Sequence, residues 1–380
     1  MATETPILDL DQPLPASPKR WPWHLLGSAI GLLIALPPIL ADHGIAFNWK
    51  GPGFNGLLFI PAVLIGIAAH ELGHLVAGKL RGFGTGDLVI GPLVVSKSGR
   101  NWTVRFRLRS FASGFFKPLA ISADVDRHGC MWMIAGGPIA SLLLTVASWL
   151  LFELYGDGTW KIVGTLCWTS LFLFLVALIP AQGSDAGRLL QLSRHPGQTD
   201  GFLLLVKLQT EEVTGVRPCE WTPQFCDALL NIEPSSTEYL WAQLFTYYRR
   251  VDEGHKLAAL PHLERALAKS SRAKDTVRAA LLCEAASACA RVKNDVHKAR
   301  VWRDRALPLL RTERETLAPV DAAIAMCENR YDDALQLFQS ARERALRRKL
   351  DSGLVRFALA KWQEAEAECR ERSMQVVSVV

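Results

Sequence analysis

Uncharged, mostly apolar residues form four long runs in the first half of the chain. Each run has about the 20 residues that a helix needs to cross a bilayer. The runs cover residues 21–41, 51–69 with a continuation to 80, 130–152 and 162–181. Tryptophans lie near several of their ends, where aromatic side chains meet lipid headgroups in membrane proteins. The pattern therefore predicts an all-α membrane domain with about four transmembrane helices.

The second half of the chain is polar and rich in Ala, Glu, Arg and Leu, which favour soluble helices. Between residues 237 and 372, alanines recur in pairs seven apart: Ala259 and Ala266, Ala299 and Ala306, Ala334 and Ala341. The last pair follows the middle one by 35 residues, close to the roughly 34-residue period of tetratricopeptide repeats. This region resembles such repeats, which bind partner segments in a concave groove. An unrelated helical bundle is the alternative.

The composition agrees with this division into a membrane-embedded half and a water-soluble half. The 380 residues are 49% hydrophobic and 21% charged, with a mean hydropathy of +0.14, which excludes a disordered or collagen-like chain. We therefore expect a cytoplasmic tail over residues 1–20, a membrane domain over 21–190, a connector over 191–236 and a soluble helical domain over 237–380. The eight cysteines show no CxxC pairing and are expected as free thiols.

Lysine and arginine concentrate in one connection between the predicted spans. The loop 81–129 is rich in them, whereas the loops 42–50 and 153–161 have one lysine each. Because short cytoplasmic loops carry the excess of positive charge, the basic loop and both termini are expected in the cytoplasm, with the spans in the inner or plasma membrane. The net charge of +6 suits anionic lipid headgroups and gives no case for nucleic-acid binding.

An H-E-x-x-H element, from His70 to His74, lies inside the second apolar run. On a helix the two histidines face the same way and can share one zinc ion, with Glu71 beside them as general base. Ionisable side chains are costly within a membrane span and usually serve a function there. The alternative is that both histidines only hydrogen-bond neighbouring helices.

Catalytic zinc usually takes three protein ligands, so a third one is needed. Asp185 is the best placed, because it follows the last apolar run at a depth that nearly matches the histidines. Pro180 and Gly183 can bend the backbone and turn this carboxylate inward. Alternatively, Asp185 is an ordinary interfacial aspartate or caps the next helix. Other cytoplasmic candidates are Asp87, Asp124, Asp126 and His128, whereas Glu153 and Asp157 lie on the opposite side.

The basic loop contains a predicted β-hairpin. Residues 88–95 are β-prone, residues 96–101 have turn chemistry, and residues 102–109 alternate between apolar and basic or polar side chains. A substrate helix must unwind before its peptide bond can be attacked, and a strand edge could hold it extended. The hairpin is expected either to pair with substrate in this way or to be a plain solvated hairpin. Arg105, Arg107 and Arg109 would meet anionic lipid headgroups.

Small residues mark the third apolar run. Gly136, Gly137, Ala140 and Ser141 let another helix approach closely, and packing is the interpretation we favour for the two glycines. Pro138 could bend the span beside the metal.

Together these elements resemble the site-2 protease family of intramembrane zinc metalloproteases. The resemblance rests on residues 70–74, on Gly-Gly-Pro-Ile-Ala-Ser at 136–141 and on the segment 179–187, and it covers about residues 55 to 190. It implies zinc ligands His70, His74 and Asp185, the catalytic base Glu71, and substrate contacts near Gly137, Pro138 and Ser141. The family usually has Asn where this chain has Ser141, and Asn-Pro where it has Ile179-Pro180.

The expected function is zinc-dependent hydrolysis of a peptide bond within or near a transmembrane segment of a membrane-protein substrate. The soluble domain would recruit the substrate or a regulatory protein. Two alternatives stay open at this point. One is a catalytically inactive membrane scaffold that binds proteins through its repeats, and the other is a zinc hydrolase acting on a lipidated substrate.

Overall fold

The computed structural model describes residues 7–9, 58–99, 101–107, 113–122, 124–155, 161–181, 184–194, 196–236, 238–310, 314–347 and 351–379. It is mostly helical with one small antiparallel sheet. The chain divides into two compact units. We call Trp21–Lys97 with Trp102–Thr210 the apolar unit, and Met1–Arg20 with Ser98–Asn101 and Glu211–Val380 the helical unit.

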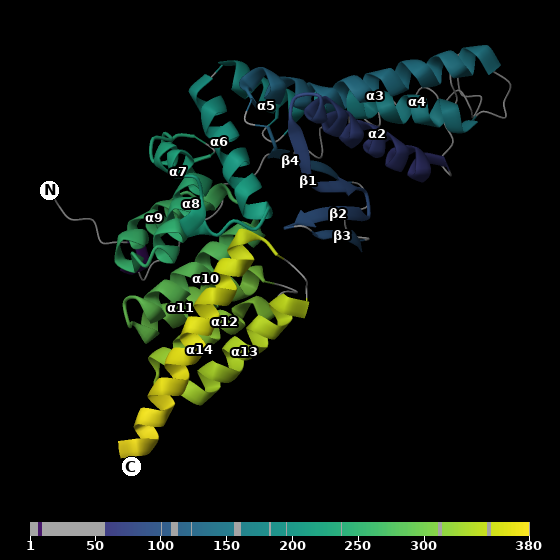
Figure 1. Ribbon diagram of the computed structural model, residues 1–380. Coiled ribbons are helices and arrows are strands. Elements are labelled where there is room, and N and C mark those ends of the chain that lie inside the picture. The colour runs from purple at the N-terminus through teal and green to yellow at the C-terminus, as the bar shows by residue number, and fades with distance from the viewer. Residues whose placement is uncertain are drawn as a thin grey trace. The chain divides into compact units, whose positions relative to one another are not determined.

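Three apolar helices lie side by side in the apolar unit (Figure 1). They are α2 (Phe59–Lys79), α3 (Arg127–Tyr155) and α4 (Lys161–Ala177), and they are followed by α5 (Asp185–Arg194) and α6 (Pro196–Val213). At about 1.5 Å per residue, the 21 residues of α2 extend about 31 Å and the 29 residues of α3 about 44 Å. Both lengths suffice for a bilayer whose hydrocarbon core is about 30 Å thick.

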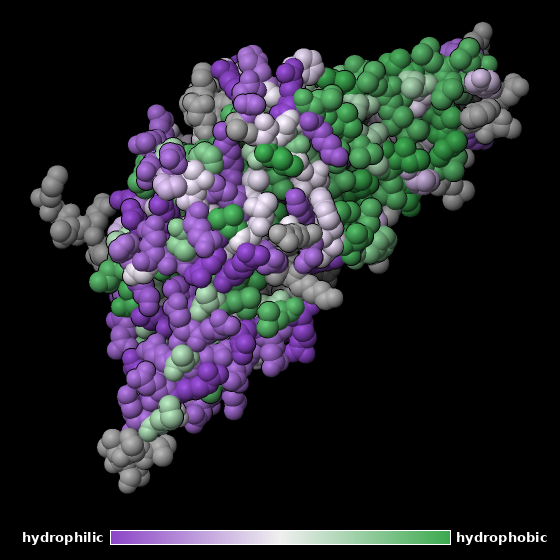
Figure 2. Space-filling model, viewed as in Figure 1, coloured by the Kyte–Doolittle hydropathy of each residue, from purple (hydrophilic) through white to green (hydrophobic). Residues whose placement is uncertain are grey.

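Two of the predicted spans are long and apolar enough to cross a membrane within the described part of the chain, namely α2 and α3. Only 28% and 39% of their most apolar stretches are buried, unlike core helices of soluble proteins. Large apolar side chains are instead exposed on them, among them Ile60, Val76, Leu143, Leu150 and Leu154. Figure 2 shows the resulting hydrophobic surface over α2, α3 and α4. The predicted fourth span is the shorter, 17-residue helix α4, and the predicted first span lies outside the described residues.

Helices α2 and α3 pack backbone against backbone. A Cβ atom added at Gly73 would overlap the carbonyl oxygen of Gly136, and one added at Gly136 would overlap that of Gly73. A close approach of this kind needs small residues on both helices. The packing role predicted for Gly136 is confirmed.

The β structure is larger than the predicted hairpin. Strands β1 (Phe83–Ile90), β2 (Leu93–Ser98), β3 (Asn101–Phe106) and β4 (Gly114–Ala120) form one antiparallel sheet in the order β3-β2-β1-β4. The expected first strand, 88–95, is divided between β1 and β2, because Gly91 takes φ +55 and makes a turn with Pro92. Strand β4 escaped prediction because Pro118 argues against a strand except at a sheet edge, where β4 lies.

The helical unit begins with α7 (Pro223–Leu229) and continues as three successive helix pairs (Figure 1). The pairs are α8 (Tyr239–Asp252) with α9 (Lys256–Ala268), α10 (Asp275–Arg291) with α11 (Val296–Ala306), and α12 (Ala318–Cys327) with α13 (Tyr331–Arg347). A last helix, α14 (Gly353–Val379), packs on α13. All six alanines of the sequence pattern are buried on the second helix of a pair, where a small side chain lets the first helix approach.

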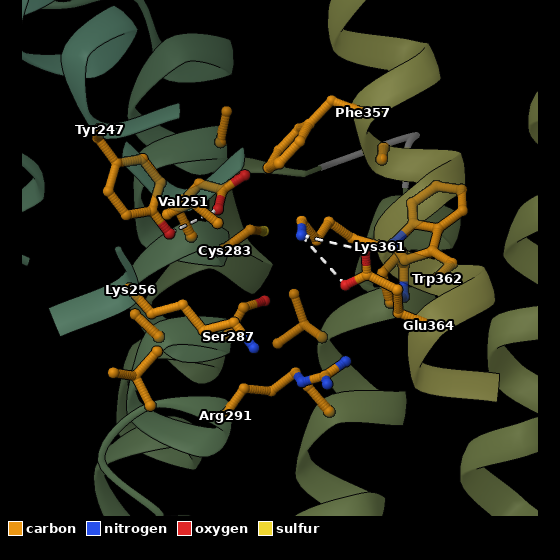
Figure 3. A pocket seen from close by; sticks show the side chains of 18 of the residues that line it. Tyr247, Val251, Lys256, Cys283, Ser287, Arg291, Phe357, Lys361, Trp362 and Glu364 are labelled. Carbon is orange, nitrogen blue, oxygen red and sulfur yellow. Dashed lines mark hydrogen bonds and ion pairs between the residues drawn. The ribbon is translucent and has the colours of Figure 1, made fainter. Parts of the chain in front are cut away.

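A cavity of about 290 Å³ lies among α8, α10, α12 and α14 (Figure 3). Its lining includes the aromatic rings of Tyr247, Phe357 and Trp362. The Glu284 carboxyl group also lines it and accepts hydrogen bonds from the hydroxyls of Tyr247, at 3.1 Å, and Tyr248, at 3.3 Å. Burial raises the pKa of Glu284 above its usual value, against the opposing effect of these two hydrogen bonds.

Candidate metal centre

Two histidines and one aspartate converge in the apolar unit. They are His70, His74 and Asp185, and His70 is 115 positions from Asp185 in the chain. The Nε2 atom of His70 lies 3.0 Å from Asp185 Oδ2, and the Nε2 atom of His74 lies 3.5 Å from Asp185 Oδ1. One ligand atom from each residue can be chosen so that all three lie within 4.8 Å of one another. The third ligand selected from the sequence therefore lies where a shared metal needs it.

The local structure explains this convergence. His70 and His74 are four apart on α2 and face the same side of the helix, with ring centroids 4.9 Å apart. Asp185 is the first residue of α5, and Ser184 caps that helix: its Oγ accepts the N–H of Gly187 at 3.0 Å and donates to the carbonyl of Ile179. The alternative interpretation of Asp185 as the helix cap is wrong, because Ser184 fills that role.

A second layer of contacts orients both imidazoles. His74 Nδ1 lies 2.9 Å from the Met133 carbonyl oxygen and 3.3 Å from the Gly137 backbone nitrogen, both on α3. His70 Nδ1 lies 2.8 Å from the hydroxyl of Ser141. Both rings therefore turn their Nε2 atoms toward Asp185, the arrangement by which outer contacts hold metal-ligating histidines.

Two glycines let backbone approach the site. A Cβ atom added at Gly137 of α3 would overlap the imidazoles of His74 and His70, and one added at Gly114 of β4 would overlap the Glu71 carboxylate. The glycine at 137 thus faces the histidines of α2, which agrees with the packing role favoured from the sequence. Pro138 is buried beside it. The substrate contacts expected of Gly137, Pro138 and Ser141 stay a prediction.

The carboxylates of the site are held differently. Glu71 is 6% exposed and lies next to both histidines on α2. Burial opposes ionisation of Asp185, but hydrogen bonds to His70 and His74 outweigh it and lower the pKa of Asp185 to about 2. Asp185 is therefore a carboxylate at neutral pH, the form that coordinates a metal.

The donor set fits zinc. Zn–N and Zn–O bonds of about 2.0–2.2 Å in a tetrahedron place neighbouring ligand atoms about 3.4 Å apart. The two Nε2-to-carboxylate distances, 3.0 and 3.5 Å, bracket that spacing. Two imidazoles and one carboxylate are also a set that catalytic zinc uses, with a fourth position left open.

The other ligand candidates do not join this cluster. Among the residues that the structure describes, His70, His74 and Asp185 form the one group of three such side chains suited to a metal. Asp126 Oδ1 accepts the N–H of Gly129 at 2.7 Å near the start of α3. Asp124 and His128 are exposed, and Asp87 lies in β1. Asp157 lies outside the described residues.

Comparison with known proteins adds no relative: no family model, no curated protein and no solved structure matches the chain. The resemblance to the site-2 protease family rests on the motifs themselves.

Replacing Ser141 with Ala is expected to weaken zinc binding about 10–100-fold, because His70 loses the hydroxyl that orients it. The measurement is a competition titration of the detergent-purified chain with a zinc chelator. Ser148→Ala is the matched control, since Ser148 is buried seven residues further along α3. Equal zinc affinity in both variants would show that the Ser141 hydroxyl does not hold His70.

Proposed function

We propose that this chain is an intramembrane zinc metalloprotease that hydrolyses a peptide bond within or near a transmembrane segment of a membrane-protein substrate. One observation carries the proposal. His70, Glu71 and His74 lie on α2, a helix long and apolar enough to span a bilayer, and Asp185 of α5 converges on the two histidines. The motif resemblance to the site-2 protease family favours the same reaction.

The exposed apolar faces of α2 and α3 support placement of this unit in a membrane. The tail residues Ile7–Asp9 pack in the core of the helical unit, so both lie on the same side of any membrane that the chain crosses. That arrangement requires an even number of crossings between them, as four spans would give. The basic loop assigns this side to the cytoplasm of an inner or plasma membrane.

The residues of the site divide the chemistry between them. His70, His74 and Asp185 would hold the ion, and a bound zinc supplies Lewis-acid chemistry that activates water and polarises a carbonyl near neutral pH. Glu71 takes the proton from the attacking water and delivers it to the leaving amine nitrogen. At Gly137 and Gly114 the backbone approaches the histidines and Glu71 so closely that no side chain fits between them.

Strand β4 offers an edge on which a substrate can lie extended. The Ala120 N–H points away from β1 and donates to Thr210 Oγ1 at 2.8 Å. The Ser113 carbonyl points toward the β1 side and accepts the Gly91 N–H at 2.8 Å. Since peptide groups alternate along a strand, those of Gly114 and Phe116 point away from β1. This free edge begins at Gly114, next to Glu71. We therefore assign substrate pairing to β4 instead of the predicted hairpin.

Phe116→Pro is expected to slow cleavage of a membrane-segment substrate about two- to tenfold, the equivalent of one lost hydrogen bond. The substitution removes an outward N–H and leaves the β1–β4 hydrogen bonds in place. Phe116→Ala is the control, because it loses the same ring and keeps the N–H. If the two variants cleave at the same rate with equal zinc content, the substrate does not pair with this edge.

The cavity of the helical unit supports a role in recruitment. A space of about 290 Å³ walled by Tyr247, Phe357 and Trp362 is large enough for one aromatic or aliphatic side chain. We propose that it binds the cytoplasmic segment of the substrate or of a regulatory protein.

The proposal as a whole is tested with the full chain purified in detergent. We expect about one zinc per chain, cleavage of a reporter that contains a transmembrane segment, loss of cleavage with a chelator and recovery with zinc. A folded chain without zinc would favour a membrane scaffold. Bound zinc with hydrolysis of a lipidated peptide, and none of the transmembrane reporter, would favour the other alternative.

A further inference from the structure

The tail residues Ile7–Asp9 form one 3-10 turn that packs against α9 of the helical unit. The Leu8 side chain is fully buried in the core that α8, α9, α10 and α11 share, and Ile7 is partly buried against the same core. Leu263 and Leu267 of α9, also buried, belong to that core. A tail segment far from these helices in sequence thus places one fully buried aliphatic side chain among them.

Trp302 of α11 binds the backbone of the tail. Its indole is 1% exposed, and the Nε1–H donates to the Leu8 carbonyl oxygen at 3.2 Å. The Arg305 guanidinium stacks over the same ring at 4.6 Å. A buried indole N–H needs an acceptor, and here that acceptor is a peptide carbonyl of the tail.

The tail contact is also small relative to the core that receives it. Leu8 is the one tail residue in this core within the described part of the chain, and the other members lie between residues 240 and 324 on the helices and the turns between them. The helices therefore bury most of this core against one another. Within the described residues, the tail adds to this core only the side chains of Leu8 and, partly, Ile7, together with the hydrogen bond of the Leu8 carbonyl.

We propose that the site formed by α9 and Trp302 is a peptide-binding site, and that the chain's own N-terminal tail is its ligand in cis. We call it the Trp302 site. It recognises a short segment with an aliphatic side chain at the position of Leu8 and a free carbonyl at the same residue. The helical unit is thereby connected to the predicted membrane region twice, through α6 and through residues 10–20. This inference does not depend on the protease activity.

The experiment uses the full-length chain with a protease recognition site inserted between Gln12 and Pro18 and an affinity tag before residue 1. After cutting, the tagged tail is expected to stay with the chain through a detergent washing step. A peptide of residues 1–14, added in excess, should release the tail, whereas the same peptide carrying Leu8→Asp should release at least tenfold less at equal concentration. Trp302→Phe keeps a smaller aromatic ring, removes the N–H donor and should speed release severalfold.

Several results would overturn the proposal. One is loss of the tail from the folded, cut chain without competitor, and another is equal competition by both peptides. Retention unchanged in Trp302→Phe would remove this residue from the site. A further test mixes tagged, cut chains with untagged chains in detergent. If tails are transferred to untagged chains while the chains assemble, but not afterwards, the tail binds a second copy. The assignment in cis would then be wrong.

Discussion

Glu71→Gln is expected to lower the rate of peptide hydrolysis about a thousandfold while the chain keeps its zinc. Glu71 lies beside the proposed metal ligands, is not one of the three converging side chains and approaches Gly114 of the sheet edge. The amide has the shape of the carboxylate but cannot accept the proton of the attacking water. General acid–base catalysis typically contributes about 10²–10⁴-fold, which sets the size of the loss.

The measurement is single-turnover cleavage of a transmembrane reporter by detergent-purified chain, with zinc determined in the same samples. Glu153→Gln is the matched control, because Glu153 is exposed near the end of α3. Cleavage by Glu71→Gln at more than a tenth of the wild-type rate would remove Glu71 from the role of base. A parallel loss of zinc would instead make it a ligand.

Asp185→Ala is expected to lose zinc, with an affinity decrease larger than the roughly 10–100-fold that an outer contact costs. The Asp185 carboxylate lies near both Nε2 atoms, at 3.0 and 3.5 Å, and its removal leaves two imidazoles without the acidic group between them. Zinc content after dialysis against a weak chelator measures the effect, and cleavage should fall with it.

Asp124→Ala is the control for this variant, since Asp124 is an exposed carboxylate of the basic loop. It should retain about one zinc per chain. Full zinc occupancy in Asp185→Ala, with the helices intact by circular dichroism, would place the third ligand elsewhere. Asp185→Asn should give an intermediate affinity, because the amide oxygen keeps the position and loses the charge.

The convergence of His70, His74 and Asp185 could be predicted because the signals for it are local in sequence. Two histidines four apart on one helix must face the same side, and a carboxylate after a later span of matching direction must lie at a similar depth. Both inferences need only helix geometry and a common direction. The capping role of Ser184 was not predicted, because serine and aspartate are both preferred caps and Asp185 was the residue considered for that position.

The contacts around the centre could not be predicted, because they depend on how separate elements pack. Nothing in the spacing relates Met133 to His74, since a backbone carbonyl has no sequence signature. Gly114 beside Glu71 depends on β4, a strand concealed by Pro118 and visible only once β1 is in place. The turn at Gly91 was concealed in the same way by the β-prone residues on both sides of it.

The shortness of α4 has a consequence for the bilayer if this helix is the fourth span that the sequence predicts. Its 17 residues extend about 26 Å, several ångströms less than the hydrocarbon thickness of a typical bilayer. A bilayer accommodates a short span by thinning around it. Since α4 leads within eight residues to Asp185, the thinned annulus would lie beside the metal ligands, where it shortens the path of water from the cytoplasm and lowers the cost of drawing a substrate helix out of the lipid.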